Sequence, residues 1–322
     1  MPLDTIYLTR HGHRMNWTID YSTGTYHSAF PTATGNPADP SLTAHGVRQS
    51  HELAAHVTSD KFAPKPWVTY SSPFYRCLQT IQPSIDGLNK LHEAEGKEHR
   101  GVRIENGLGE WFGASTYFEH PPPASPSQLR TYFPTIITAA TEHQHKAHVI
   151  PSSNGETIPQ LHNRVATALA AIISDVDSQI QAEEARTGNS SSKAILICSH
   201  AAPLIAMGRA LTGNVPDDVN TEDFYVYTTG LSTFVRRQSN PAAGETVGER
   251  SLLAAGTKLV PENEVQVPDW KDGKGVGGGW DCVSNGDCSF LSGGEERGWH
   301  FNGEESFDTG PMTDGNEETA KL

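Results

Sequence analysis

The sequence predicts an α/β protein with three layers, a mostly parallel central sheet and helices on both of its faces. Short β-type runs alternate with segments of helical periodicity along most of the chain, which is typical of this class. Residues 194–198, with the sequence AILIC, form an almost continuous apolar run, as expected of a central strand buried on both faces. The chain has 322 residues, of which 36% are hydrophobic, so it is long enough for one large domain and an appendage.

Charge and glycine content divide the chain near residue 240. The net charge is −14, and the segment from Pro241 onward has 16 Asp and Glu against 6 Lys and Arg, a net of −10. The same segment contains 15 of the 30 glycines. We therefore predict one domain at residues 1–240 and an acidic, Gly-rich extension at 241–322. The acidic balance argues against direct nucleic-acid binding, and the lack of a long apolar run argues against a membrane span.

The first half opens with a strand, and a long insertion at residues 14–40 follows it. This insertion carries four aromatic residues without a clear period, which favours a functional loop. Thr43 is a plausible N-cap of the next helix, whose apolar face reaches Val57. We expect strands at residues 5–8, 67–70 and 102–104, with a second helix through residues 76–85.

The second half contains another irregular segment with aromatic residues, and we call this segment and the insertion at residues 14–40 the two aromatic excursions. The second half also contains the strongest helical pattern in the chain. Residues 112–150 are rich in Pro, Ala and His, and apolar residues recur at helical spacing between residues 156 and 180. Cys77 and Cys198 are expected to be buried thiols in the core. For Cys282 and Cys288 in the extension, a metal-binding pair is the less favoured alternative, because no second Cys or His pair follows at ligand spacing. We expect a helix at residues 203–211 and strands at residues 194–198, 225–227, 232–235 and 252–260.

Residues able to bind phosphate follow several of the expected strands. Arg10 and His11 end the first strand, Arg76 lies one turn into a helix, His200 ends the apolar strand, and Glu110 lies in a Gly-rich turn. Open α/β sheets bind ligands at the carboxyl ends of their strands. Arginine forks bind phosphoryl oxygens, an imidazole can attack phosphorus, and a carboxylic acid can protonate the leaving oxygen. Helix N-termini, expected after residues 12, 72 and 199, add partial positive charge.

Five segments in this order resemble the histidine phosphatase superfamily, also called the phosphoglycerate-mutase-like fold. The resemblance covers roughly residues 4–237, and several ordered matches are far more specific than one. It implies that His11 is the nucleophile, that Arg10, Arg76 and His200 hold the phosphoryl group, and that Glu110 donates the proton. The matching segments are residues 8–12, 41–46, 71–80, 110–111 and 199–200.

Two groups within the superfamily resemble this chain further. The UBA/SH3-domain protein tyrosine phosphatases share an Arg-His-Gly-x-Arg-Met opening, here with Arg14 and Met15, and a Glu-Trp pair. Arg14 is thus a further phosphate-binding candidate, or a partner in a nearby ion pair. The phosphatase-like part of the fungal 55 kDa subunit of transcription factor TFIIIC also resembles it, with an acidic C-terminal extension. Two departures are His13, where these groups usually have Glu, and Trp17, where mutases usually have Asn.

The favoured function is a metal-independent phosphomonoesterase, without a cofactor, that forms a phosphohistidine on His11. The aromatic excursions favour aryl phosphates or phosphotyrosine as substrates. A non-enzymatic scaffold subunit of a TFIIIC-type complex is the alternative, with the tail docking a protein partner. A phosphoglycerate-type mutase ranks lower, because residues 15–40 contain no Lys or Arg. We expect the protein in the cytoplasm, the nucleus or both, and we expect a chain ending near residue 240 to keep its activity.

Overall fold

A computed structural model describes residues 2–138, 145–188, 190–238, 252–260 and 266–301. Its centre is a six-stranded sheet in the order β10-β8-β1-β7-β4-β5. Strands β1, β7, β4 and β5 are parallel, and β8 runs antiparallel to both of its neighbours, β1 and β10. The predicted mostly parallel sheet is confirmed. The strands are β1 (Thr5–Arg10), β4 (Pro66–Ser71), β5 (Val102–Ile104), β7 (Ala194–Ser199), β8 (Leu231–Arg236) and β10 (Trp280–Asp287).

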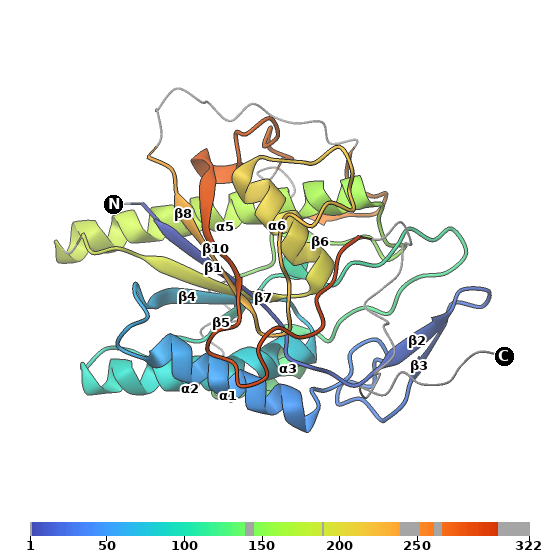
Figure 1. Ribbon diagram of the computed structural model, residues 1–322, viewed down its shortest axis with the longest axis horizontal. Helices are drawn as coiled ribbons and strands as arrows, with labels where there is room; N and C mark the ends of the chain where they lie inside the picture. The colour runs from blue at the N-terminus through green and yellow to red at the C-terminus, as the bar shows by residue number, and fades with distance from the viewer. Residues whose placement is uncertain (1, 139–144, 189, 239–251, 261–265, 302–322) are drawn as a thin grey trace.

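Helices cover both faces of this sheet, which confirms the three-layer prediction (Figure 1). One face packs on α1 (Ala44–Thr58) and α2 (Tyr75–Ala94), and the other packs on α5 (Ile158–Thr187) and α6 (Ala201–Thr212). Side chains of successive strand residues alternate between the two cores: Ile6 and Leu8 contribute to the α5–α6 core, and Tyr7 to the other. Thr43 caps α1 as predicted, because its hydroxyl accepts a hydrogen bond from the Gly46 N–H at 3.1 Å.

The two aromatic excursions form small structures beside the main sheet. Residues 14–40 include the hairpin β2 (Trp17–Asp20) and β3 (Thr25–Ser28), which projects from the sheet edge in Figure 1. The second excursion contains α3 (Pro126–Tyr132), the 3₁₀ turn η1 (Asn106–Leu108) lies just before it, and β6 (Val149–Ile150) closes it. The strand expected at 252–260 is only β9 (Lys258–Leu259), and it pairs with β6 outside the main sheet. Residues 225–227 do not form the expected strand.

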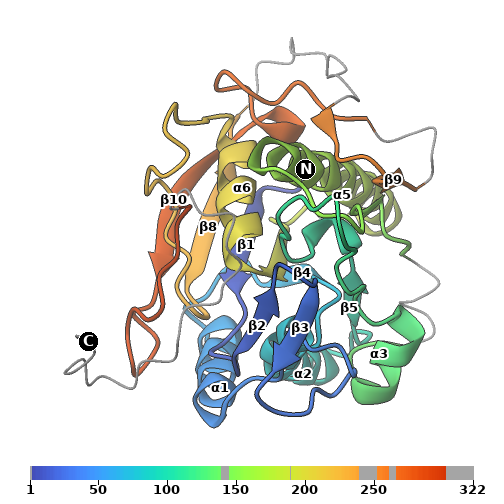
Figure 2. The same cartoon turned by 90° about the vertical axis from the view of Figure 1, so that its right-hand side faces the viewer.

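The described part of the expected C-terminal extension belongs to the domain, which corrects the expected boundary near residue 240. Strand β10 pairs with β8 as an edge strand, seen at the left of the sheet in Figure 2. Trp270, Trp280 and Phe301 are at most 1% exposed and join the α5–α6 core, with the 3₁₀ turn η3 (Val276–Gly278) between the two tryptophans. The average composition of this segment concealed a few large apolar residues, which are sufficient to anchor it.

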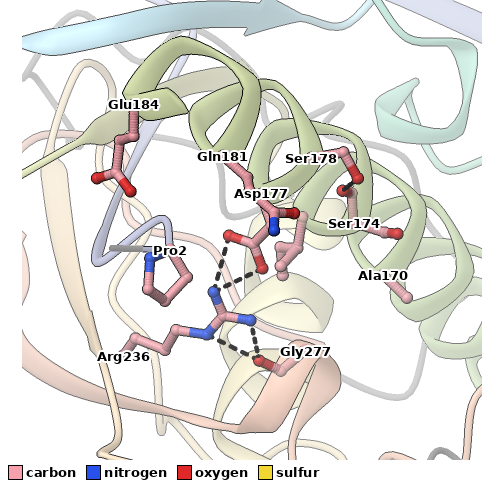
Figure 3. Close-up of a pocket in the computed structure, with 10 residues that line it drawn as sticks. Pro2, Ala170, Ser174, Asp177, Ser178, Gln181, Glu184, Arg236 and Gly277 are labelled. Atoms are coloured by element: carbon pink, nitrogen blue, oxygen red, sulfur yellow. Dashed lines mark hydrogen bonds and ion pairs between the residues drawn. The ribbon is translucent and has the colours of Figure 1, made fainter. Parts of the chain in front are cut away.

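A pocket of about 520 Å³ lies between α5 and the end of β8 (Figure 3). Arg236 donates hydrogen bonds to both carboxylate oxygens of Asp177, at 2.9 and 2.8 Å, and to the Gly277 carbonyl. None of the predicted site residues lines this pocket. It therefore marks a junction of β8, α5 and the C-terminal segment and not the predicted site. Within the described ranges, no helix is both long and apolar enough to span a membrane.

Candidate active site

The carboxyl ends of β1, β4 and β7 bring the predicted residues together. Arg10 pairs in register with Ser199, and Ser71 pairs with Cys198, so the residues that follow these strands are neighbours. The His11 N–H donates to the Ser199 carbonyl at 3.0 Å. All six predicted residues are at most 6% exposed: Arg10, His11, Arg14, Arg76, Glu110 and His200. The structure therefore gathers the candidates at one edge of the sheet.

His11 has the tautomer and the charge state that a nucleophile needs. Its Nδ1 lies 2.9 Å from the Gly12 carbonyl oxygen, and a carbonyl only accepts, so Nδ1 donates and Nε2 carries the lone pair. Burial, and then the positive charge of Arg76, lower the pKa of His11 well below its ordinary 6.5. His200, Arg10 and Arg14 lower it further. The imidazole is therefore neutral at pH 7, as attack on phosphorus requires.

Two glycines let the start of α1 approach the loop that holds His11. A Cβ at Gly12 would lie 2.9 Å from the Gly46 carbonyl oxygen, and a Cβ at Gly46 would lie 2.0 Å from the His13 carbonyl oxygen. Both contacts involve backbone atoms, which cannot move aside as a flexible side chain can. Glycine is thus required at both positions by close packing.

Arg76 connects Glu110 with His200. Its Nη2 donates to Glu110 Oε2 at 2.8 Å and lies 3.1 Å from His200 Nδ1. Its Nη1 donates to the Ala38 carbonyl at 2.9 Å and to Asp39 Oδ1 at 3.2 Å. Its Nε is buried and makes no hydrogen bond to any residue that the structure describes. A buried donor of this kind is normally satisfied, so an anionic ligand is the expected partner.

His200 lies between a hydroxyl and a carboxylate. Its Nε2 is 2.7 Å from Ser72 Oγ, and its Nδ1 is 3.2 Å from Glu110 Oε2. Burial acts to lower the pKa of His200, but Cys77 and Glu110 outweigh it, and the pKa is raised above 6.5. Burial also raises the pKa of the Cys77 thiol well above 9.0, so at pH 7 that thiol is neutral and Glu110 is the charged partner. His200 is thus suited to be a cation beside a phosphoryl group.

Arg10 and Arg14 complete the positive charge around His11. Arg10 Nη1 donates to the Val226 carbonyl at 2.9 Å and to the Arg297 carbonyl at 2.5 Å. Arg14 Nη1 donates to the Met15 carbonyl at 2.9 Å, and its guanidinium lies 5.8 Å from the centre of the Trp17 ring. Both guanidinium groups add positive charge near His11 and help to lower its pKa.

Three residues at the site were not predicted: Asp39, Ser72 and Arg297. Asp39 comes from the insertion, and its carboxylate also accepts the Tyr75 N–H at 2.8 Å. Arg297 comes from the C-terminal segment, with Nη1 3.0 Å from His13 Nε2 and a left-handed φ of 52°. Ser72 follows a strand in the same way as His11, so the strand-end pattern alone could have indicated it. Neither Asp39 nor Arg297 directly follows a strand, so the strand-end pattern in the sequence could not have indicated them.

A helix N-terminus is available at one of the three expected places. The N-cap residue of α6, His200, makes no capping hydrogen bond with its side chain, so the first N–H groups of α6 are available to an anion. At the start of α2, the Asp39 carboxylate accepts the Tyr75 N–H and so takes the place of an anion. The expected helix after Gly12 is wrong, because the chain continues there into the hairpin β2–β3. The Gly12 N–H donates to Thr80 Oγ1 at 2.9 Å.

Among the residues that the structure describes, two side-chain clusters have the spacing of metal ligands. His11, Glu110 and His200 offer atoms within 4.8 Å of one another, but three buried arginines surround them, and this charge favours an anion over a cation. Glu105, His145 and His148 form the second cluster. Glu105 accepts backbone N–H groups from residues 107, 148 and 149 and so anchors a loop. The histidine side chains there are 5% and 11% exposed, so they are not surface groups.

The family model of the histidine phosphatase superfamily (branch 1) matches residues 6–245. The chain belongs to the histidine phosphatase superfamily. Its sheet continues beyond the matched region, since β10 ends at Asp287.

Among members and relatives of the histidine phosphatase superfamily, two curated proteins are similar. The transcription factor tau 55 kDa subunit of Saccharomyces cerevisiae is 29% identical over 302 residues, covering 94% of this chain and 59% of that protein. The ecdysteroid-phosphate phosphatase of Drosophila melanogaster is 28% identical over 238 residues, covering 67% of this chain and 28% of that protein. The chain thus spans 59% and 28% of the lengths of these two relatives. A crystal structure of the ecdysone phosphate phosphatase from Bombix mori has a TM-score of 0.47 and 18% identity, over 76% of this chain and 97% of that one.

Proposed function

We propose that this protein is a metal-independent phosphomonoesterase that forms a phosphohistidine on His11. The observation that carries the proposal is a buried, neutral imidazole whose neighbours Arg76, Arg10 and Arg14 are all cationic. Such a site lowers the cost of bringing a dianionic phosphate to an uncharged nucleophile. The buried Arg76 Nε supplies a donor for a phosphoryl oxygen.

The reaction has two steps in this proposal. His11 Nε2 attacks phosphorus, a new N–P bond forms, and the bond to the leaving oxygen breaks while Glu110, charged in the free protein but brought to its acid form by the negative charge of the bound phosphate, gives that oxygen a proton. Water then attacks the phosphohistidine, the N–P bond breaks, and the proton of the water returns to Glu110. Protonated His200 and the arginines stabilise the negative charge on the phosphoryl oxygens in both steps.

Aromatic side chains beside His200 support an aryl or otherwise apolar phosphate as substrate. The Phe74 ring lies 5.0 Å from the His200 ring and 6.2 Å from Phe112, which in turn lies 6.4 Å from Trp17. Trp17 and Phe112 come from the two aromatic excursions, so both contribute to one cluster. The relative named for an ecdysteroid phosphate is consistent with this proposal. Phosphotyrosine is the aryl phosphate that we propose to test first.

A para-nitrophenyl phosphate assay of the purified full-length chain tests this function. We expect turnover that EDTA does not reduce and that vanadate inhibits competitively, because vanadate mimics the five-coordinate transition state. Phosphotyrosine and a simple alkyl phosphate, measured in parallel, report the preference for aryl groups. Activity that EDTA removes and a divalent cation restores would contradict the metal-independent mechanism.

We expect a specific response of kcat/KM to pH. The pKa of His200 is raised above 6.5, which favours its protonated form, so activity should fall on the alkaline side as that proton is lost. Glu110→Gln removes a negative charge that raises this pKa, so the alkaline limb should move to lower pH. His11 stays neutral as the pH falls through 6.5, because its pKa is lowered. An alkaline limb at the same pH in both proteins would argue against the coupling of Glu110 and His200.

Glu110→Gln should also distinguish leaving groups. General-acid catalysis contributes roughly 10²–10⁴-fold when the leaving oxygen is basic and much less when it is not. We expect kcat for an alkyl phosphate to fall by about 10²-fold or more, with a loss below about tenfold for para-nitrophenyl phosphate. Glu119→Gln, at an exposed position, is the matched control. Equal losses on both substrates would assign the proton to another group.

The alternative function is a scaffold subunit of a TFIIIC-type complex, which would place the protein in the nucleus. The observation that favours it is the similarity to the tau 55 kDa subunit, which covers 94% of this chain. A purified chain without turnover on any of the three phosphates would favour this alternative. Cytoplasmic and nuclear locations both remain proposals. A mutase remains the weakest candidate, because residues 15–40 have no Lys or Arg to hold a second phosphoryl group.

A further inference from the structure

A second positively charged hollow lies at the edge of the sheet opposite the candidate active site. Its volume is about 880 Å³, within the range of small-molecule sites. Lys65 precedes β4 and Lys193 precedes β7, so this hollow lies at the amino ends of strands whose carboxyl ends carry Ser72 and His200. Six strand residues separate the two edges, which corresponds to roughly 20 Å. The hollow is therefore distinct from the candidate active site.

The charge of this hollow is opposite to that of the whole chain. The protein has a net charge of −14 and only 24 Lys and Arg, yet six of these line the hollow together with two carboxylates. The local balance is thus +4, with histidines counted as neutral. The two carboxylates are Glu98 and Glu183. The six cations are Lys65, Lys97, Arg100, Arg103, Arg186 and Lys193.

Two of these six cations are paired with carboxylates. Lys97 lies 2.5 Å from Glu95, and Arg186 lies 2.9 Å from Glu183. The other four form no ion pair with any described carboxylate, and their hydrogen bonds go to neutral oxygens.

Lys193 donates to Ser191 Oγ at 2.9 Å, and Arg100 donates to the Trp67 carbonyl at 2.8 Å. Arg103 donates to the Tyr70 hydroxyl at 3.0 Å. Lys65 donates to the carbonyls of Val57 and Ser59. Neutral partners hold these side chains in place without cancelling their charge, so a negative ligand gains four unneutralised cations.

Aromatic rings also hold two of these four cations in place. The guanidinium of Arg100 lies 4.8 Å from the centre of the Trp67 ring, and that of Arg103 lies 5.6 Å from the Tyr70 ring. Arginines held in this way lose little side-chain entropy when a ligand binds. Together with the concave shape, this indicates a preorganised anion site.

We propose that this hollow binds a compact, multiply phosphorylated small molecule. The size of the hollow and four unneutralised cations fit a ligand with three or more negative charges. A long nucleic acid fits less well, because it would extend from the hollow over a protein surface that is acidic overall. The proposal does not depend on the chemistry at His11.

Inorganic tripolyphosphate is a suitable probe, titrated calorimetrically into the full-length His11→Ala chain so that turnover cannot consume it. We expect one site whose affinity falls as the salt concentration rises. Lys65→Gln with Lys193→Gln should weaken binding by about tenfold or more. Lys258→Gln with Lys271→Gln removes the same charge from exposed positions outside the hollow and should leave binding unchanged. In chains that retain His11, both pairs of substitutions should leave kcat/KM for para-nitrophenyl phosphate unchanged.

Four results would overturn the proposal. Tripolyphosphate that does not bind, or that binds both double variants equally, excludes the hollow as its site. Tripolyphosphate that vanadate displaces is bound at the candidate active site instead. A short single-stranded oligonucleotide that binds more tightly than tripolyphosphate, with loss only in the Lys65 and Lys193 variant, would assign the hollow to nucleic acid.

Discussion

Replacing His11 by alanine should lower kcat for para-nitrophenyl phosphate by at least about 10⁴-fold, the size of loss typical when a covalent nucleophile is removed. Its imidazole is neutral and directed by the Gly12 carbonyl, and three arginines surround it. The only other imidazole in this cluster is His200, whose raised pKa favours the protonated form, which cannot attack phosphorus. Among the residues that the structure describes, this cluster therefore contains no other group that can replace His11 as the nucleophile.

Rapid quenching under alkaline conditions, which preserve phosphohistidine, would measure the intermediate directly. We expect radiolabelled phosphate on the wild-type chain and none on the His11→Ala chain. His51→Ala, at an exposed position of α1, is the matched control and should behave like the wild type. A chain that turns over without label, or a variant that keeps its rate, would contradict the nucleophile that we propose.

A chain that ends at residue 238 should fail to fold stably, contrary to the expectation from composition. It lacks β10 and three almost fully buried aromatic residues: Trp270, Trp280 and Phe301. Loss of one buried aromatic side chain costs about 3–5 kcal/mol, and a typical domain has only about 5–15 kcal/mol of stability. The truncation also removes the Arg297 carbonyl that accepts a hydrogen bond from Arg10.

A chain that ends at residue 301 is the matched comparison, because it keeps every described contact of the C-terminal segment. We expect it to unfold cooperatively at the temperature of the full-length chain, while the shorter chain aggregates or unfolds without a sharp transition. Circular dichroism and differential scanning calorimetry would measure both. A shorter chain with an unchanged melting temperature would restore the boundary near residue 240.

Local sequence patterns were sufficient to predict the sheet and to predict that the candidate site residues lie together at one of its edges. Arg10, His11 and His200 lie directly after strands, and parallel strands bring such positions to one edge whatever the rest of the fold does. The position of Arg76 is predictable for the same reason, because it lies in the first turn of the helix that follows β4. Residues at strand ends are therefore predictable from the order of the elements alone.

The partners of these residues were not predictable, because they depend on tertiary packing of irregular segments. Asp39 reaches Arg76 from the insertion, and Arg297 reaches His13 and Arg10 from beyond β10. The position of neither residue is fixed by a periodic pattern. The C-terminal segment was misjudged for a related reason: its mean composition is polar, but its stability depends on three aromatic residues in particular places.

The position of β1 in the sheet has a consequence for how the chain folds during its synthesis on the ribosome. The strand that carries His11 is made first but lies between β7 and β8, whose residues are synthesised about 190 and 230 positions later. The nascent chain can therefore not assemble its centre from the N-terminus onward, and such distant pairing is slow to form. Because the Arg297 carbonyl, which accepts a hydrogen bond from Arg10, is synthesised later still, catalytic competence should appear only after residue 297 has left the exit tunnel. A partly made chain would then expose apolar strands for longer than its length suggests and would depend on chaperones to keep them apart.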